Sequence, residues 1–259
     1  MRMSSWTPDI VRFMEDAASV TAYFEILAQI CTRGLSRESL ILDAGCGMGQ
    51  LAIELAKHGH RVDAIDKSPQ AIAYAQEKAR ETLTSGCVRV RQGDFRECGA
   101  HARSAHGAPY DRMVFCLSAR VEDAFATARE NGTKSLVVIN KMGGCVAASD
   151  DASNRLPRPA VCDVNRTLDA LDECGIVCDA HEISLEFGQP FRTLDDAARY
   201  FSLFRTRSFP HGVTKRELMA TLEPFDERGF AYYLPVERHL VMFAVDMEAS
   251  LRASLTAVA

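Results

Sequence analysis

The feature that most constrains the fold of this chain is a short apolar segment that changes abruptly into glycines. Residues 39–44 are apolar apart from a serine and an aspartate, and a Gly-Cys-Gly-Met-Gly run at 45–49 follows at once. From residue 50 onward, apolar side chains recur at helical spacing. This pattern is typical of a buried strand, a tight turn and a helix whose N-terminus and bare turn admit a ligand.

Strands and helices alternate along the first half of the chain. Apolar spacing over residues 8–33 predicts one or two N-terminal helices. Further on, strands are predicted at 39–44, 61–66, 88–92, 111–117 and 135–141, with helices at 50–58, 68–83 and 121–130. Such an alternation favours a parallel sheet covered by helices on both faces.

The pattern is looser after residue 141. Residues 142–160, rich in small and polar residues, are expected to form a loop. We then predict a helix at 163–174, a strand at 176–187, helices near 193–204 and 214–227, and a last strand at about 230–246. Pro235 is expected to interrupt that strand or to follow a turn before it.

Composition narrows the classes of partner. The chain has 259 residues, enough for a domain with a large core. Its net charge of −5 gives no electrostatic attraction toward nucleic acid. No apolar stretch approaches the roughly 20 residues that cross a bilayer, and no signal peptide is evident, so we expect a cytoplasmic protein without a membrane partner. Cys174 and Cys178 lack a second close pair, so no metal site is expected.

Other nucleotide-binding motifs fit less well at the glycine turn. The chain contains no phosphate-binding G-x-x-x-x-G-K-[ST] loop. A dinucleotide fingerprint that starts at Gly45 fails at Gln50, but one that starts at Gly47 fits, so an NAD-dependent oxidoreductase stays open. Asp43 would be poorly placed beside a pyrophosphate and suits a positively charged ligand.

This segment resembles the first motif of the class I S-adenosylmethionine (SAM)-dependent methyltransferases. That motif is an apolar strand, an acidic residue and a G-x-G-x-G turn. Asp43, Gly45, Gly47 and Gly49 match it, with Cys46 inside the turn. The resemblance implies that these residues bind SAM.

A second acidic landmark lies at the end of the next strand. The family has a carboxylate there that accepts hydrogen bonds from both ribose hydroxyls of the cofactor, a task that suits two oxygens. Asp66 occupies this place, 17 residues after Gly49. Lys67 and Ser68 follow it, as the turn on the adenine side does in the family.

Two further landmarks follow in order. Gly93, Asp94 and Phe95 match the family's acidic position near the adenine amino group. Cys116 and Leu117 end the fourth strand, which in the family lies beneath the methionine moiety. The resemblance thus covers residues 38–141.

The family's fold is an expectation for the whole chain. It is an α/β fold, Rossmann-like, with a seven-stranded, mostly parallel sheet, helices on both faces and an antiparallel last strand. We expect a single domain over 1–259, with an N-terminal helical lid at 1–36, a SAM-binding core at 37–141, and sheet completion at 142–259 including a small helical insertion at about 189–228.

The resemblance also implies an activity, transfer of the SAM methyl group to a small molecule at oxygen, nitrogen or sulfur, with S-adenosylhomocysteine as product. No Asn-Pro-Pro-Tyr-type motif follows the fourth strand, so the usual mark of methylation at an amide or nucleobase amino group is absent. Because an activated sulfonium needs mainly alignment and exclusion of water, such an enzyme needs at most one general base, and His211 is the candidate for that role. Candidate acceptor-side residues are Trp6, Ser118, Arg120, Lys141, Arg205 and Tyr233.

Three alternatives remain at this point. One is methylation of RNA or protein, which the acidic net charge disfavours. Another is a SAM-binding protein that transfers no methyl group, and the third is the oxidoreductase. We expect a monomer or a homodimer.

Overall fold

The computed structural model describes residues 6–82, 84, 86–97, 108–142, 163–204 and 213–256. The chain divides into two compact units. Unit 1 comprises Met1–Trp6, Phe24–Ile183 and His239–Ala259, and unit 2 comprises Thr7–Tyr23 and Ser184–Arg238.

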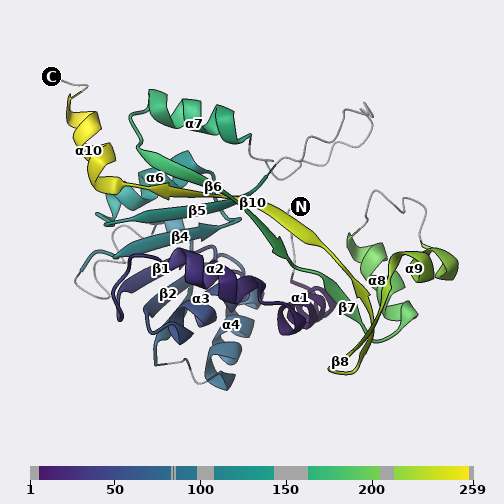
Figure 1. Cartoon of the computed structure of the whole chain (residues 1–259). Coiled ribbons are helices and arrows are strands. Elements are labelled where there is room, and N and C mark those ends of the chain that lie inside the picture. The colour runs from purple at the N-terminus through teal and green to yellow at the C-terminus, as the bar shows by residue number, and fades with distance from the viewer. Residues whose placement is uncertain are drawn as a thin grey trace. The chain divides into compact units, whose positions relative to one another are not determined.

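A seven-stranded sheet forms the core of unit 1, with the strand order β3-β2-β1-β4-β5-β10-β6 (Figure 1). The strands are β1 (Leu40–Ala44), β2 (Arg61–Asp66), β3 (Val88–Gln92), β4 (Arg112–Cys116), β5 (Leu136–Lys141), β6 (Cys178–Glu186) and β10 (Glu237–Val245). Strands β1 to β5 pair in parallel, whereas β10 pairs antiparallel with β5. This arrangement confirms the predicted Rossmann-like sheet with an antiparallel last strand.

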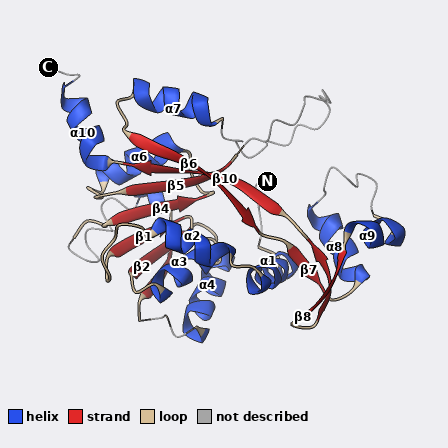
Figure 2. Ribbon diagram, viewed as in Figure 1, coloured by secondary structure: helices blue, strands red, loops and turns tan. Residues whose placement is uncertain are grey.

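Helices connect and cover these strands (Figure 2). The helices of the described residues are α1 (Pro8–Val20), α2 (Tyr23–Cys31), α3 (Gln50–Lys57), α4 (Pro69–Glu81), α6 (Val121–Glu130), α7 (Val164–Glu173), α8 (Leu194–Phe204), α9 (Lys215–Thr221) and α10 (Met247–Thr256), with a 3-10 turn, η1, at Phe95–Glu97. Ser68 caps α4, because its hydroxyl accepts from the Ala71 N–H at 3.3 Å and Pro69 begins the helix.

Alternation along β1 decides which of its side chains approach the site. Leu42 and Ala44 join a core cluster that includes Ala124 of α6 and Leu171 of α7. Ile41 and Asp43 therefore point to the opposite face of the sheet. All five residues of β1 are buried, which agrees with the prediction of a strand that is covered on both faces.

Unit 2 has its own small antiparallel sheet, in the order β7-β9-β8. These strands are β7 (Gln189–Phe191), β8 (Glu223–Glu227) and β9 (Phe230–Leu234). A cluster of buried side chains from α1, α8, β7, α9 and the residue after α9 forms its core: Phe13, Phe191, Ala197, Phe201, Leu218 and Leu222. The region expected to be a helical insertion thus contains strands as well as helices.

The predicted helix at 214–227 is wrong in its second half, where β8 lies instead. Pro224 disfavours a continuing helix. Arg228 and Gly229, with φ values of 53° and 80°, then form a two-residue turn into β9, the geometry that suits a β-hairpin. The strand predicted at about 230–246 is correspondingly two strands, β9 and β10, with Pro235 between them.

A buried hydrogen-bond network beside β2 yields a stability prediction. The Asp63 carboxylate accepts from the Tyr110 hydroxyl at 2.6 Å and from Arg89 at 2.7 Å and 3.0 Å. We expect Tyr110→Phe to lower the free energy of unfolding by about 1.5–3 kcal/mol, because it removes a hydrogen bond to a buried charge. Urea unfolding followed by circular dichroism measures this loss.

Tyr74 provides the matched control. Its hydroxyl is buried and has no hydrogen-bond partner among the described residues. Tyr74→Phe should therefore leave stability unchanged or raise it slightly. Equal losses in the two variants would contradict the assignment of the Tyr110 hydroxyl to the network.

Candidate cofactor-binding site

The glycine turn after β1 is fastened to the end of β2. The N–H groups of Gly45 and Cys46 both donate to the Ile65 carbonyl, at 2.8 Å and 3.0 Å. The Gly49 N–H closes the turn on the Cys46 carbonyl at 2.9 Å. The loops that follow the two strands are therefore held side by side.

The three glycines of this turn have positive φ values, 78° at Gly45, 53° at Gly47 and 78° at Gly49. A Cβ at Gly45 would lie 2.4 Å from the Ser118 Cβ, and one at Gly49 would lie 2.9 Å from the Ala75 Cβ. These two glycines therefore permit close packing of the turn on its neighbours as well as the backbone conformation.

Gly47 faces a different neighbour. A Cβ there would lie 3.3 Å from Cζ2 of Trp6, so the indole ring lies against this part of the turn. Trp6 is the single tryptophan of the chain. Its position next to the turn agrees with the idea that a residue near the N-terminus covers the site, although a lid function stays a prediction.

Asp66 links the two loops through its carboxylate. One oxygen accepts from the Gly47 N–H at 2.9 Å and the other from the Ser68 N–H at 2.8 Å. A carboxylate offers about four acceptor positions, so each oxygen can accept one further hydrogen bond. This residue can bind a vicinal diol while it holds the turn in place.

Asp43 lies under the same turn and is 1% exposed. Its Oδ2 atom has no hydrogen-bond partner among the described residues. Burial, and next the charge of Asp66, raise the pKa of Asp43 to about 7, while the Ala52 N–H acts in the opposite direction. A buried oxygen without a partner is costly, so this position fits a site completed by a polar or cationic ligand.

Asp94 has a different environment. Its carboxylate pairs with Lys67 Nζ at 2.7 Å and with Arg96 Nη2 at 2.8 Å. The hydrogen bonds from Arg96 and then Lys67 hold the pKa of Asp94 well below its usual range. Asp94 therefore stays ionised, and an adenine ring near it would meet an ion-paired carboxylate.

The neighbours of Asp94 divide between the loop and the core. The Gly93 N–H donates to the Asp66 carbonyl at 2.9 Å, which joins this third loop to the second. The Phe95 ring packs edge-on against Phe115 of β4 with 5.1 Å between centroids. Phe95 thus contributes to the hydrophobic core.

The end of β4 carries a strained residue. Leu117 has a φ of 57° and is 56% exposed, an unusual combination for a large apolar side chain. The Cys116 thiol before it has a pKa raised well above its usual value, mainly by burial. The Ser118 hydroxyl donates to the Ala44 carbonyl at 2.6 Å, so it supports the glycine turn.

The remaining sequence candidates are scattered. Arg120 lies 3.4 Å from Asp123 in an exposed ion pair at the start of α6, and Lys141 ends β5. Tyr233 belongs to unit 2, where its hydroxyl donates to Glu186 at 2.6 Å. Arg205 and His211 lie outside the described residues.

Two contributors to this site were missed in the sequence. Ala75 of α4 packs where Gly49 leaves room, and only the small residues in that helix hinted at it. Arg96 both donates its backbone N–H to Asp94 at 3.0 Å and pairs with its carboxylate. The Asp-x-Arg spacing is the local signal for that pair.

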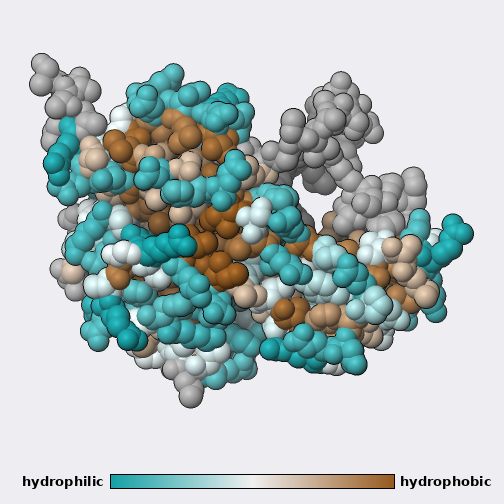
Figure 3. Space-filling model, in the orientation of Figure 1, coloured by the Kyte–Doolittle hydropathy of each residue, from teal (hydrophilic) through white to brown (hydrophobic). Residues whose placement is uncertain are grey.

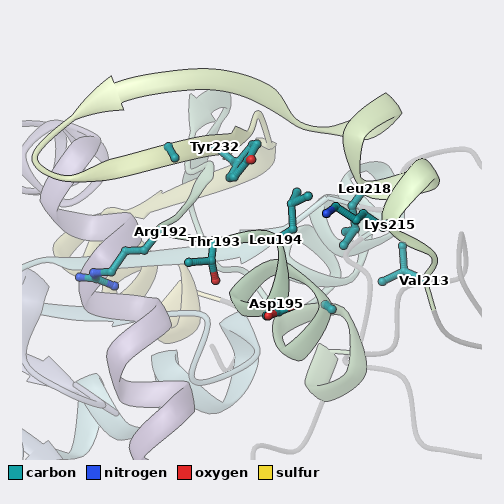
Figure 4. A pocket seen from close by; sticks show the side chains of 10 residues that line it. Arg192, Thr193, Leu194, Asp195, Val213, Lys215, Leu218 and Tyr232 are labelled. Carbon is teal, nitrogen blue, oxygen red and sulfur yellow. The ribbon is translucent and has the colours of Figure 1, made fainter.

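Unit 2 contains a separate open cleft of about 490 Å³ (Figure 4). Leu194, Leu218 and Tyr232 supply apolar surface, and Lys215 adds a cation. Arg192 also lines the cleft, but its guanidinium is paired with Asp16 of α1 at 2.7 Å. A cleft of this size can hold a small molecule.

The described helices include none with the length and apolar character that crossing a bilayer requires.

Comparison with known proteins identifies the first half of the chain. A family model described as a methyltransferase domain matches residues 41–139. The SAM-dependent Diels–Alderase iliD of Neonectria sp. (strain DH2) is 39% identical over 69 residues, which cover 26% of this chain and 28% of that protein. The ubiquinone biosynthesis O-methyltransferase of Methylocella silvestris is 39% identical over 74 residues, 29% of this chain and 26% of that enzyme.

The chain thus spans little more than a quarter of the length of either relative. Among solved structures, the YcgJ protein from Bacillus subtilis aligns with a TM-score of 0.51 and 11% identity over 85% of this chain and 97% of that chain. That likeness shows the fold alone. The family match therefore identifies residues 41–139 as a methyltransferase domain, and the glycine turn, the acidic strand ends and the sheet order of unit 1 resemble those of the class I SAM-dependent methyltransferases.

Proposed function

We propose that unit 1 binds SAM at the ends of β1 and β2, and that the chain transfers its methyl group to a small-molecule acceptor. The observation that carries this proposal is the position of Asp66. Its carboxylate fixes the glycine turn through the Gly47 N–H and keeps an acceptor position on each oxygen. These two positions suit the two hydroxyls of a ribose.

Bound SAM supplies a methyl group already activated by its sulfonium, so the chain's own residues have to bind, orient and exclude water. Asp66 would accept from the ribose hydroxyls, and the bare backbone at Gly47 would allow close approach. Asp43, buried beneath the turn, would stabilise positive charge or orient a water. Trp6, which lies against Gly47, would limit the access of solvent.

Several observations favour a small acceptor over a macromolecule. The net charge of −5 gives no electrostatic attraction toward a polyanion. The cleft of unit 2 has the volume of a metabolite site, and apolar, basic and acidic side chains line it. The described cysteines are all free thiols, which suits a reducing compartment, so we place the protein in the cytoplasm.

A second candidate function uses the same cofactor without methyl transfer. One relative is named as a SAM-dependent Diels–Alderase, and a Diels–Alder reaction is a cycloaddition that moves no methyl group. No general base is apparent among the described residues near Asp66, and neither function requires one. Methylation of RNA or protein is less favoured than these two functions because the chain has a net negative charge.

One experiment separates these functions. Calorimetry should detect SAM binding, and Trp6 fluorescence should change with the same affinity. Incubation with methyl-labelled SAM and a metabolite extract should then release S-adenosylhomocysteine and label a small molecule. Binding without any S-adenosylhomocysteine would favour the second function, and no binding at all would overturn both.

Replacing Asp66 gives a direct test of the site. Asp66→Ala should weaken SAM binding by about 1–3 kcal/mol, roughly 5- to 150-fold, because hydrogen bonds to a charged acceptor are lost. Asp66→Asn, which keeps one acceptor oxygen, should lie between this variant and the wild type. Asp123→Ala, at an exposed carboxylate of α6, is the control. Unchanged affinity in both Asp66 variants would remove Asp66 from the site.

Asp43 predicts a dependence of stability on pH. Its pKa of about 7 in the folded chain exceeds the roughly 3.9 of an unfolded aspartate. Between these values the folded state binds more protons, so stability falls as the pH rises through this window. We expect the stability of Asp43→Asn to gain about 2–3 kcal/mol relative to wild type between pH 5 and 8.

Urea unfolding at a series of pH values measures this difference, and Asp123→Asn serves as a control at an exposed carboxylate. Parallel profiles for wild type and Asp43→Asn would show that Asp43 has an ordinary pKa. The same variant should bind SAM more weakly if the buried charge serves the cofactor.

A further inference from the structure

Strand β6 forms an edge of the seven-stranded sheet. Just before it, the Val177 carbonyl accepts from the Asp246 N–H at 3.0 Å and the Val177 N–H donates to the Ser250 hydroxyl at 2.9 Å. The backbone groups of Val177 therefore point inward, toward β10 and α10. Because these groups alternate along a strand, those of Cys178, Ala180 and Glu182 point outward. No strand of the described residues pairs with that side.

The side chains of this segment also alternate between two faces. Cys178 and Ala180 pack against the core cluster that includes α6 and α7. Residues 179 and 181–183 line an open trough of about 660 Å³ together with residues of α2, β5 and β10. Alternation places the side chains of Asp179, His181 and Ile183 on this face. Val177 belongs to this face by alternation and is 47% exposed.

The ionisable side chains of this edge restrict which strand can pair with it, but other protective features are missing. Residues 177–183 contain no proline, and the apolar Val177 is exposed at one end. Figure 3 shows hydrophobic side chains at the surface over the β5 and β6 side of unit 1. An acidic and a basic side chain, Asp179 and His181, stand two positions apart on one face.

We propose that this edge pairs with the same edge of a second copy of the chain, antiparallel about a two-fold axis at Ala180. The outward backbone groups of Cys178, Ala180 and Glu182 would then form a ladder that continues the sheet. Asp179 would lie opposite the partner subunit's His181, and Val177 opposite the partner subunit's Ile183. Each of these contacts occurs twice because the interface is symmetric.

Charge selects this register over its neighbours. Opposed residues share a face, so symmetric pairings can be centred only on one residue. Centring on Asp179, His181 or Glu182 would place identical ionisable side chains directly opposite each other. Centring on Ala180 instead opposes small side chains at the axis. It also places Asp179 and His181 in non-hydrogen-bonded positions, where side chains approach most closely.

Sedimentation equilibrium of the full chain at micromolar concentration tests the proposal. The wild type should be a dimer. Asp179→Lys sets a lysine opposite a histidine, and His181→Glu sets a glutamate opposite an aspartate, so each variant should dimerise roughly tenfold or more weakly. Glu130→Lys, which makes the same charge change as Asp179→Lys at an exposed position of α6, should dimerise like wild type.

Mixing the two weakened variants is the decisive experiment. In a mixed dimer, Lys faces Glu at one pair of positions and Asp faces His at the other, so dimerisation should return. A structural defect in either variant would not be repaired by the other. A monomeric wild type, dimers unaffected by both substitutions, or no recovery on mixing would each overturn the proposed interface. SAM binding is independent of these outcomes.

Discussion

The hydrogen bonds that Asp66 accepts from Gly47 and Ser68 hold the candidate site together. They couple the loop after β1 to the loop after β2, and the Ile65 carbonyl fastens the same turn from below. Without them the glycine turn would have to be ordered by the ligand itself, at the cost of binding free energy. A carboxylate that shapes the site before any ligand arrives can still bind that ligand, because it has acceptor positions to spare.

Three aspartates at neighbouring strand ends lie in three different electrostatic environments. Asp43 is buried with an unpartnered oxygen, Asp66 is held by backbone N–H groups, and Asp94 is paired with two cations. Burial thus raises the pKa of Asp43, whereas hydrogen bonds from Arg96 and Lys67 lower the pKa of Asp94. The separation allows one carboxylate to remain responsive to a bound charge while another remains ionised.

The part of the chain that can be assigned to a family lies within one of the two units. The family match ends at residue 139, within unit 1 and its cofactor loops. Unit 2, with its own aromatic core and cleft, lies outside that match.

The sequence by itself determined the cofactor half, because apolar alternation, glycines and caps are local signals. It placed β1 to β5 within a residue or two, and it placed Asp43 and Asp66 at strand ends. The sequence did not predict β8, because the residues before the turn at Arg228 and Gly229 are recognised as a strand only once their pairing with β9 is known. Only the tertiary structure decided that Ser118 packs under Gly45, that Asp94 pairs with Lys67, and that β6 lies at an edge, because these depend on contacts between distant segments.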